Sequence, residues 1–220
     1  TGAEKYKKAA MHLRDQLRTH PRTNEGGFWH KKIYPNQMWL DGLYMGAPFY
    51  AEYAMLFHED TAFNDIANQF IWMEQHARDP KTGLLYHAWD ESKQQQWANK
   101  TTGTSPHFWA RAMGWYADAL VDALDYFPVD HPKRNDLIGI LNRLVNAIEK
   151  QQDPETGLWY DVMNYNGPGK EKNYLAKGDT RLQIMPGMVA QVDVITGKRT
   201  VFEYIFSPFT KMMQESFREK

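Results

Sequence analysis

The sequence predicts a mainly α-helical fold built from helical hairpins. Two observations carry this prediction: apolar residues recur at helical spacing through most of the chain, and one turn motif returns between helices. Richly apolar helices alternate with amphipathic ones, as expected of inner and outer helices in layers. If the hairpins curl into a toroid, the starts of the inner helices face one mouth.

We expect five helices in the first three quarters of the chain. The second and fourth are rich in aromatic or apolar residues, which marks them as inner helices. Ser105 followed by Pro106 predicts a cap and a first helical position for the fourth helix. The predicted ranges are residues 4–19, 35–58, 61–77, 105–127 and 133–151.

A turn motif repeats along the chain. The stretch DPKTGLLYH at residues 79–87 returns as DPETGLWYD at residues 153–161, and a looser copy, TNEGGFWH, occupies residues 23–30. Each copy follows an amphipathic helix, turns on a glycine, and delivers an aromatic and then a polar residue. The repeat therefore predicts successive hairpins of similar construction.

The repeat brings four polar residues to equivalent places. Aligning the two inner helices sets Asp41 opposite Arg111, and His30 and His87 end equivalent copies of the turn motif. We expect these four side chains to converge at the mouth.

Candidate chemistry follows from these residue types. Asp41 could serve as general acid and base if burial raised its pKa, or it could cap or salt-bridge a helix. Arg111 could clamp a substrate carboxylate or be structural, and one of the two histidines could be a core residue. Aromatic residues make up 14% of the chain, and Trp109 and Trp115 could wall a sugar groove or fill the core.

Composition excludes several classes. The chain has no Cys, so it has no disulfide and no Cys-ligated metal, and a net charge of −1 argues against binding to nucleic acid or an anionic membrane. No stretch approaches the roughly 20 apolar residues of a spanning helix. Phosphate-loop, dinucleotide and zinc motifs do not occur, and we expect no metal or cofactor. The compartment, cytoplasmic or periplasmic, stays open.

The pattern changes near residue 176. Residues 182–195 are rich in branched side chains, which predicts a β-strand, followed by a turn at 196–199 and an amphipathic helix over 201–218. We therefore predict two parts, residues 1–176 and residues 177–220.

Five ordered motifs in the first part carry a family resemblance. They are GFWHKK (27–32), QMWLDGLYMG (37–46), GLLYHAWDE (83–91), SPHFWARAMGW (105–115) and QDPETGLWY (152–160). Residues 1–176 resemble glycoside hydrolase family 105, the unsaturated rhamnogalacturonyl hydrolases. The resemblance implies a partial (α/α)6 toroid, because the first hairpin and an upstream acidic residue of the family are missing.

The resemblance also implies an activity. Family members remove the terminal 4,5-unsaturated uronic acid from pectin-derived oligosaccharides by hydrating its double bond, and the matching catalytic residue is Asp41. No metal or other cofactor is implied. By motif match, the residues that contact the substrate would be His30, Lys31, Leu40, His87, Trp109, Arg111 and Trp115.

The second part has a different resemblance. Residues 179–220 are similar to the C-terminus of membrane fusion (adaptor) proteins of type I secretion systems. Two alternatives to the hydrolase therefore stay open, a secretion adaptor fragment and a sugar-binding remnant without turnover. An open toroid would leave apolar helix faces exposed, so self-association is also expected.

Overall fold

The structure is a computed structural model that describes residues 4–155, 157–163, 174–177 and 180–183. It divides into two units, Thr1–Asn173 and Tyr174–Lys220, which we describe separately. The described elements of the first unit are α1 (Glu4–Thr19), β1 (Gln37–Trp39), α2 (Leu40–Leu56), α3 (Ala62–Ala77), β2 (Ala88–Asp90), α4 (Ala110–Tyr126) and α5 (Arg134–Glu149). The prediction of a mainly helical fold is confirmed.

The second unit contributes one strand pair. The strands β3 (Tyr174–Lys177) and β4 (Thr180–Gln183) are antiparallel, with Leu175 opposite Leu182. The strand predicted over residues 182–195 overlaps only the end of β4. Its remainder, the predicted turn and the predicted last helix lie outside the described residues.

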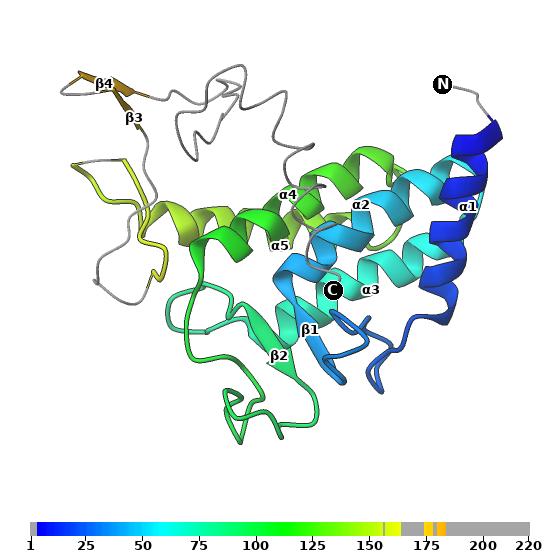
Figure 1. The fold of residues 1–220 in the computed structure, drawn as a ribbon, viewed down its shortest axis with the longest axis horizontal. Helices are drawn as coiled ribbons and strands as arrows, with labels where there is room; N and C mark the ends of the chain where they lie inside the picture. The colour runs from blue at the N-terminus through cyan, green and yellow to red at the C-terminus, as the bar shows by residue number, and fades with distance from the viewer. Residues whose placement is uncertain (1–3, 156, 164–173, 178–179, 184–220) are drawn as a thin grey trace, which may run out of the picture. The chain divides into compact units, whose positions relative to one another are not determined.

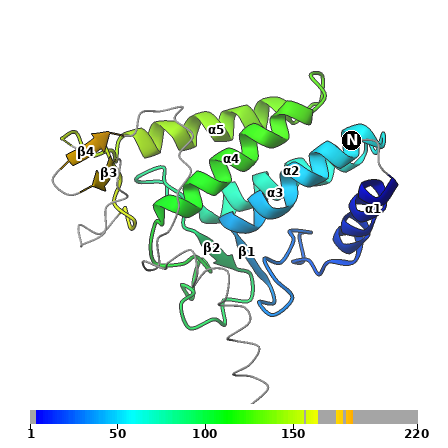
Figure 2. The same cartoon turned by 45° about the horizontal axis from the view of Figure 1, so that its top comes forward.

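The helices of the first unit form two layers. Figure 1 shows α2 and α4 side by side with α3 and α5 behind them, and Figure 2 shows β1 and β2 at one end of α2 and α4. The core between the layers is built from large apolar side chains with almost no exposed surface, among them Phe63, Phe70, Met113, Tyr116 and Leu120. The buried Tyr116 hydroxyl donates to the Phe70 carbonyl at 2.8 Å, so it does not remain unpaired.

Both inner helices begin later than the sequence predicted. Helix α2 starts at Leu40 instead of residue 35, because Gln37–Trp39 pairs with Ala88–Asp90 as an antiparallel strand. Helix α4 starts at Ala110 instead of Ser105, so the predicted proline start was wrong. Ser105 instead donates its backbone N–H to the Ala88 carbonyl at 2.9 Å, which ties it to β2.

The turn motif has the same backbone geometry in its two closest copies. The Gly83 N–H donates to the Asp79 carbonyl at 2.9 Å, and the Gly157 N–H donates to the Asp153 carbonyl at 2.8 Å. Both glycines have positive φ, +75° and +68°, a conformation that other residues adopt only at a cost. The glycine of the motif is therefore required by the turn itself.

The residue that ends each of these copies holds the start of the preceding inner helix. The first N–H of α2, from Leu40, donates to the His87 carbonyl at 2.9 Å, and the first N–H of α4, from Ala110, donates to the Asp161 carbonyl at 2.8 Å. The first amides of a helix have no partner within the helix. The repeat supplies that partner from the next hairpin.

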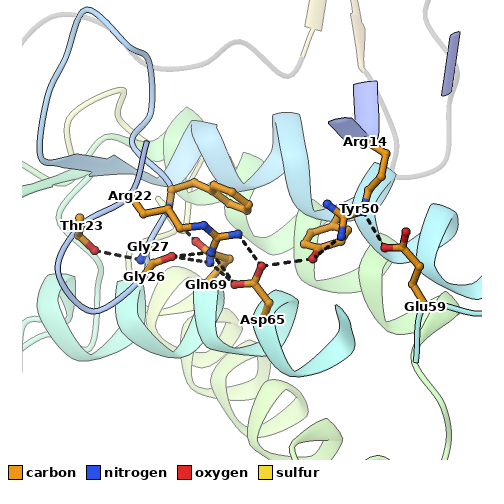
Figure 3. Close-up of polar contacts among 10 residues, drawn as sticks. Arg14, Arg22, Thr23, Gly26, Gly27, Tyr50, Glu59, Asp65 and Gln69 are labelled. Atoms are coloured by element: carbon orange, nitrogen blue, oxygen red, sulfur yellow. Dashed lines mark hydrogen bonds and ion pairs between the residues drawn. The ribbon is translucent and has the colours of Figure 1, made fainter. Parts of the chain in front are cut away.

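A polar network holds the loop that follows α1 against α3 (Figure 3). Both terminal nitrogens of Arg22 reach the Asp65 carboxylate at 2.7 Å. Asp65 also accepts from the Gln69 amide at 2.9 Å, and the Gln69 carbonyl oxygen accepts the Phe28 backbone N–H at 2.8 Å. The network therefore positions the segment that leads to His30.

The network extends to α1 and α2. The Tyr50 hydroxyl donates to Asp65 at 3.3 Å, and Arg14 donates to the Tyr50 oxygen at 3.2 Å and to Glu59 at 2.7 Å (Figure 3). Burial, with Asp65 nearby, raises the pKa of Tyr50 to about 12, so its hydroxyl stays protonated.

Asp65→Ala should lower the free energy of unfolding by about 2 kcal/mol, because Arg22 and Gln69 lose a partly buried acceptor. Urea denaturation followed by circular dichroism measures this change. Asp15→Ala is the matched control, since Asp15 pairs with Arg18 on an exposed surface and its loss should not be measurable. Equal destabilisation by the two substitutions would contradict the assigned role of Asp65.

Candidate active site

Three polar residues meet where β1 leads into α2. The His30 N–H donates to the Gln37 carbonyl at 2.7 Å, and the Leu40 N–H donates to the His87 carbonyl. These bonds place His30 and His87 on either side of the segment that carries Asp41. The Asp41 charge acts on the pKa of both histidines, so the three side chains lie within electrostatic reach. They are three of the four residues that the repeat predicted to converge, and the fourth, Arg111, lies against Trp109.

Two rings cover one face of Trp39. The His30 ring stacks on it with centroids 4.5 Å apart, and the Tyr34 ring stacks on it at 5.2 Å. The centroids of His30 and Tyr34 are 6.2 Å apart. Rings on opposite faces would be at least about 7 Å apart, twice the contact separation of about 3.5 Å. His30 and Tyr34 therefore lie side by side on the same face.

A second run of contacts joins α2 to α4. His87 makes edge-to-face contacts with Trp39 at 5.8 Å and with Trp109 at 6.1 Å. The Arg111 guanidinium lies 4.3 Å from the Trp109 ring centroid. Trp39, His87, Trp109 and Arg111 thus form a continuous series from one inner helix start to the next.

Trp115 lies one turn beyond Arg111 on α4. Its ring contacts Tyr44 of α2, with centroids 4.5 Å apart. With Arg111 and Trp159 it lines a cavity of about 430 Å³, which is within the size range of small-molecule sites.

The remaining two predicted contacts differ in exposure. Lys31 is exposed, with its amino group 5.8 Å from the Tyr34 ring centroid. Leu40 has no exposed surface and belongs to the core. Its burial does not favour the direct sugar contact expected from the sequence, and its backbone bond to His87 indicates a structural role.

Two polar atoms of the site are buried without a hydrogen-bond partner among the described residues. They are Oδ2 of Asp41 and Nδ1 of His30. Such atoms cost stability in a folded protein. Trp29, His131 and Arg134 also have one such atom each, so what distinguishes Asp41 and His30 is that their unpaired atoms occur in the same site. Gly42 makes room for this arrangement, since a Cβ at that position would lie 2.9 Å from His30 Nδ1.

Burial keeps both histidines neutral near pH 7. Desolvation lowers the pKa of His30 and of His87, and the nearby Asp41 carboxylate offsets this only in part. A hydrogen bond between the His87 ring and the His107 backbone also acts to raise the pKa of His87. Neutral imidazoles can both donate and accept hydrogen bonds, which suits recognition of sugar hydroxyls.

Tyr34 and Trp39 contact the candidate site residues, although we did not predict this. The sequence held one indication for Trp39, because it directly precedes the segment that carries Asp41. The place of Tyr34 depends on how the loop between His30 and β1 folds.

No group of three or more metal-ligating side chains occurs among the described residues, and none of their helices is long and apolar enough to span a membrane.

A sequence profile of Glycosyl Hydrolase Family 88 matches residues 1–176. The chain belongs to this family. It is 32% identical over 170 residues to the unsaturated rhamnogalacturonyl hydrolase YesR of Bacillus subtilis, which covers 74% of this chain and 47% of YesR. It is also 39% identical over 123 residues to protein Atu3128 of Agrobacterium fabrum, covering 56% of this chain and 52% of that protein.

Similar solved structures come from glycoside hydrolase family 105. A family 105 glycoside hydrolase from C. acetobutylicum is 54% identical, with a TM-score of 0.76 over 79% of this chain and 48% of that chain. A possible family 105 member from Klebsiella pneumoniae is 25% identical, with a TM-score of 0.66 over 78% of this chain and 44% of that chain. The resemblance to family 105 is thereby confirmed. The chain spans about half the length of the curated relatives it matches.

The free energy of unfolding of this chain should decrease as pH falls. Both histidines have a folded-state pKa below the unfolded value of about 6.5, so the unfolded chain binds more protons below that pH. The free energy of unfolding, measured in urea at pH 7.5 and pH 5.5, should therefore decrease with acidification. The double variant His30→Asn, His87→Asn should show a smaller decrease than the wild type. The control His12→Asn, an exposed change on α1, should show the same decrease as the wild type. An unchanged decrease in the double variant would contradict the assignment.

Proposed function

We propose that this chain carries the catalytic site of a glycosidase that removes a terminal 4,5-unsaturated uronic acid from rhamnogalacturonan-derived oligosaccharides. The observation that carries the proposal is the buried, unpartnered Oδ2 of Asp41 between two neutral histidines. The similarity to a relative named as an unsaturated rhamnogalacturonyl hydrolase supports the substrate class.

Asp41 would act as both acid and base. An unsaturated uronide is an enol ether, so a proton delivered from Asp41 to C4 creates an oxocarbenium ion at C5. Water attacks C5 and gives its proton back to the Asp41 carboxylate. The resulting hemiketal opens and releases the rest of the oligosaccharide, so the enzyme recovers its starting state. This route needs one carboxyl group, unlike displacement by two carboxylates.

The surrounding residues would bind and orient the sugar. Arg111 and Lys31 carry the positive charges of the site and would face the uronate carboxylate. His30 and His87 would hydrogen-bond to hydroxyls near the reacting carbons. Trp109 and Trp115 would provide the apolar wall against which the sugar rings pack.

Asp41→Asn should reduce kcat at least about 100-fold, because general acid–base catalysis contributes factors of that size or larger. The measurement is the loss of alkene absorbance when the chain is incubated with a lyase-generated unsaturated disaccharide. Asp122→Asn, an exposed carboxylate on α4, serves as control and should retain wild-type activity. Equal rates for wild type and Asp41→Asn would contradict the proposed role of Asp41 as general acid and base. Disaccharide binding without alkene loss would instead support the sugar-binding remnant.

The second part of the chain has its own proposal. We propose that residues 177–220 form a separate part that resembles type I secretion adaptors.

We also propose that the first unit self-associates through exposed apolar side chains. Tyr6, Met11 and Leu13 of α1 are between 45% and 55% exposed, which supports self-association.

Sedimentation equilibrium should show a dimer or larger species at micromolar concentration, and Leu13→Glu should shift the population toward monomer. Glu4→Gln, an exposed change on the same helix, is the control. A monomer at all concentrations would exclude self-association. Co-purification with an inner-membrane transporter tests the adaptor resemblance.

A further inference from the structure

Ser105 lies buried beside His87, in the loop that leads to α4. Its residue is 1% exposed, and its hydroxyl oxygen is 3.0 Å from Nδ1 of His87. Neither the turn repeat nor the motif resemblance assigned it a role in the site.

The Ser105 hydroxyl is itself held firmly. Its backbone N–H donates to the Ala88 carbonyl at 2.9 Å, and the Ala88 N–H donates to the Ser105 oxygen at 3.3 Å. A serine hydroxyl has one hydrogen and two lone pairs, so one lone pair is used by Ala88 and the rest of its capacity is available to His87. The position of the Ser105 oxygen is therefore fixed by Ala88, and its hydrogen bond can orient the His87 imidazole.

We propose that Ser105 is a positioning residue that fixes the ring of His87 for the reaction at Asp41. The hydrogen bond to Nδ1 sets the rotation of the imidazole about its link to Cβ, and so holds the ring between Trp39 and Trp109. Because Ser105 is also paired with β2, the same bond links the loop before α4 to the strand that follows His87. The functional half of this inference rests on the proposed hydrolase activity.

Loss of the hydroxyl should leave the His87 ring bonded to the His107 backbone but without its partner at Nδ1, so the ring is held less firmly. One neutral hydrogen bond contributes about five-fold to an equilibrium, so Ser105→Ala should lower kcat about five-fold with little change in KM. Thr104→Ala is the matched control, because Thr104 is also buried but shares its hydroxyl bond with Thr102 instead of with a histidine. Ser105→Thr keeps the hydroxyl and should restore most of the rate.

The ring of His87 gives a readout that does not depend on turnover. In ¹⁵N NMR spectra of the intact chain, the wild type and Thr104→Ala should show two distinct ring nitrogens, as one tautomer requires. Ser105→Ala should shift the Nδ1 resonance, because this nitrogen loses its hydroxyl partner while the bond with the His107 backbone remains. Identical His87 spectra in wild type and Ser105→Ala would overturn the proposal, whatever the activity. If Ser105→Ala does not fold, Ser105→Cys, with a weaker donor, is compared in the same way.

An altered spectrum with unchanged kinetics would overturn the functional half of the proposal alone. Wild-type chain that fails to turn over the disaccharide, yet shows the expected spectra, would count against the proposed hydrolase activity while the assignment of Ser105 stands.

Discussion

The backbone pairing of Gln37–Trp39 with Ala88–Asp90 is the constraint on which the site depends. Its register sets Trp39 opposite Ala88 and leaves the Leu40 N–H facing the His87 carbonyl. The His30 N–H joins the same arrangement through Gln37. Side chains alternate along a strand, so a slip of one residue would turn His87 away from the start of α2.

The same device recurs at the next inner helix with different chemistry. Ala110 and Asp161 repeat the bond that Leu40 and His87 make, because each inner helix needs a partner for its first amide. The repeat thus fixes backbone positions and leaves the side chains free to differ. In this chain the equivalent helix position after each of these first residues carries an acid, Asp41, in one case and a base, Arg111, in the other.

The loop before His30 is held by polar groups that have partners, whereas two polar groups of the candidate site each have a buried atom without one. Arg22, Asp65 and Gln69 satisfy one another almost completely and secure the loop that precedes His30. Asp41 and His30 instead each keep one buried atom without a partner. The unpaired atoms of Asp41 and His30 each cost stability, and they leave both groups able to bond to a substrate.

The sequence by itself determined the helical class and the extents of α1, α3 and α5 to within about two residues, because periodicity and repetition are local properties of a chain. The repeat also predicted that His30, Asp41 and His87 lie near one another, together with Arg111, which the structure places against Trp109. Tertiary structure decided where α2 and α4 begin. The segment before α2 pairs with β2, and the segment before α4 pairs with Ala88 at Ser105 and with Val162 at Trp109, so neither segment is helical as local preference favoured. It also decided that Leu40 is core, that Tyr34 shares a face of Trp39 with His30, and that Ser105 holds His87 instead of capping a helix. These outcomes depend on which segments meet in space, and spacing along a single chain does not contain that information.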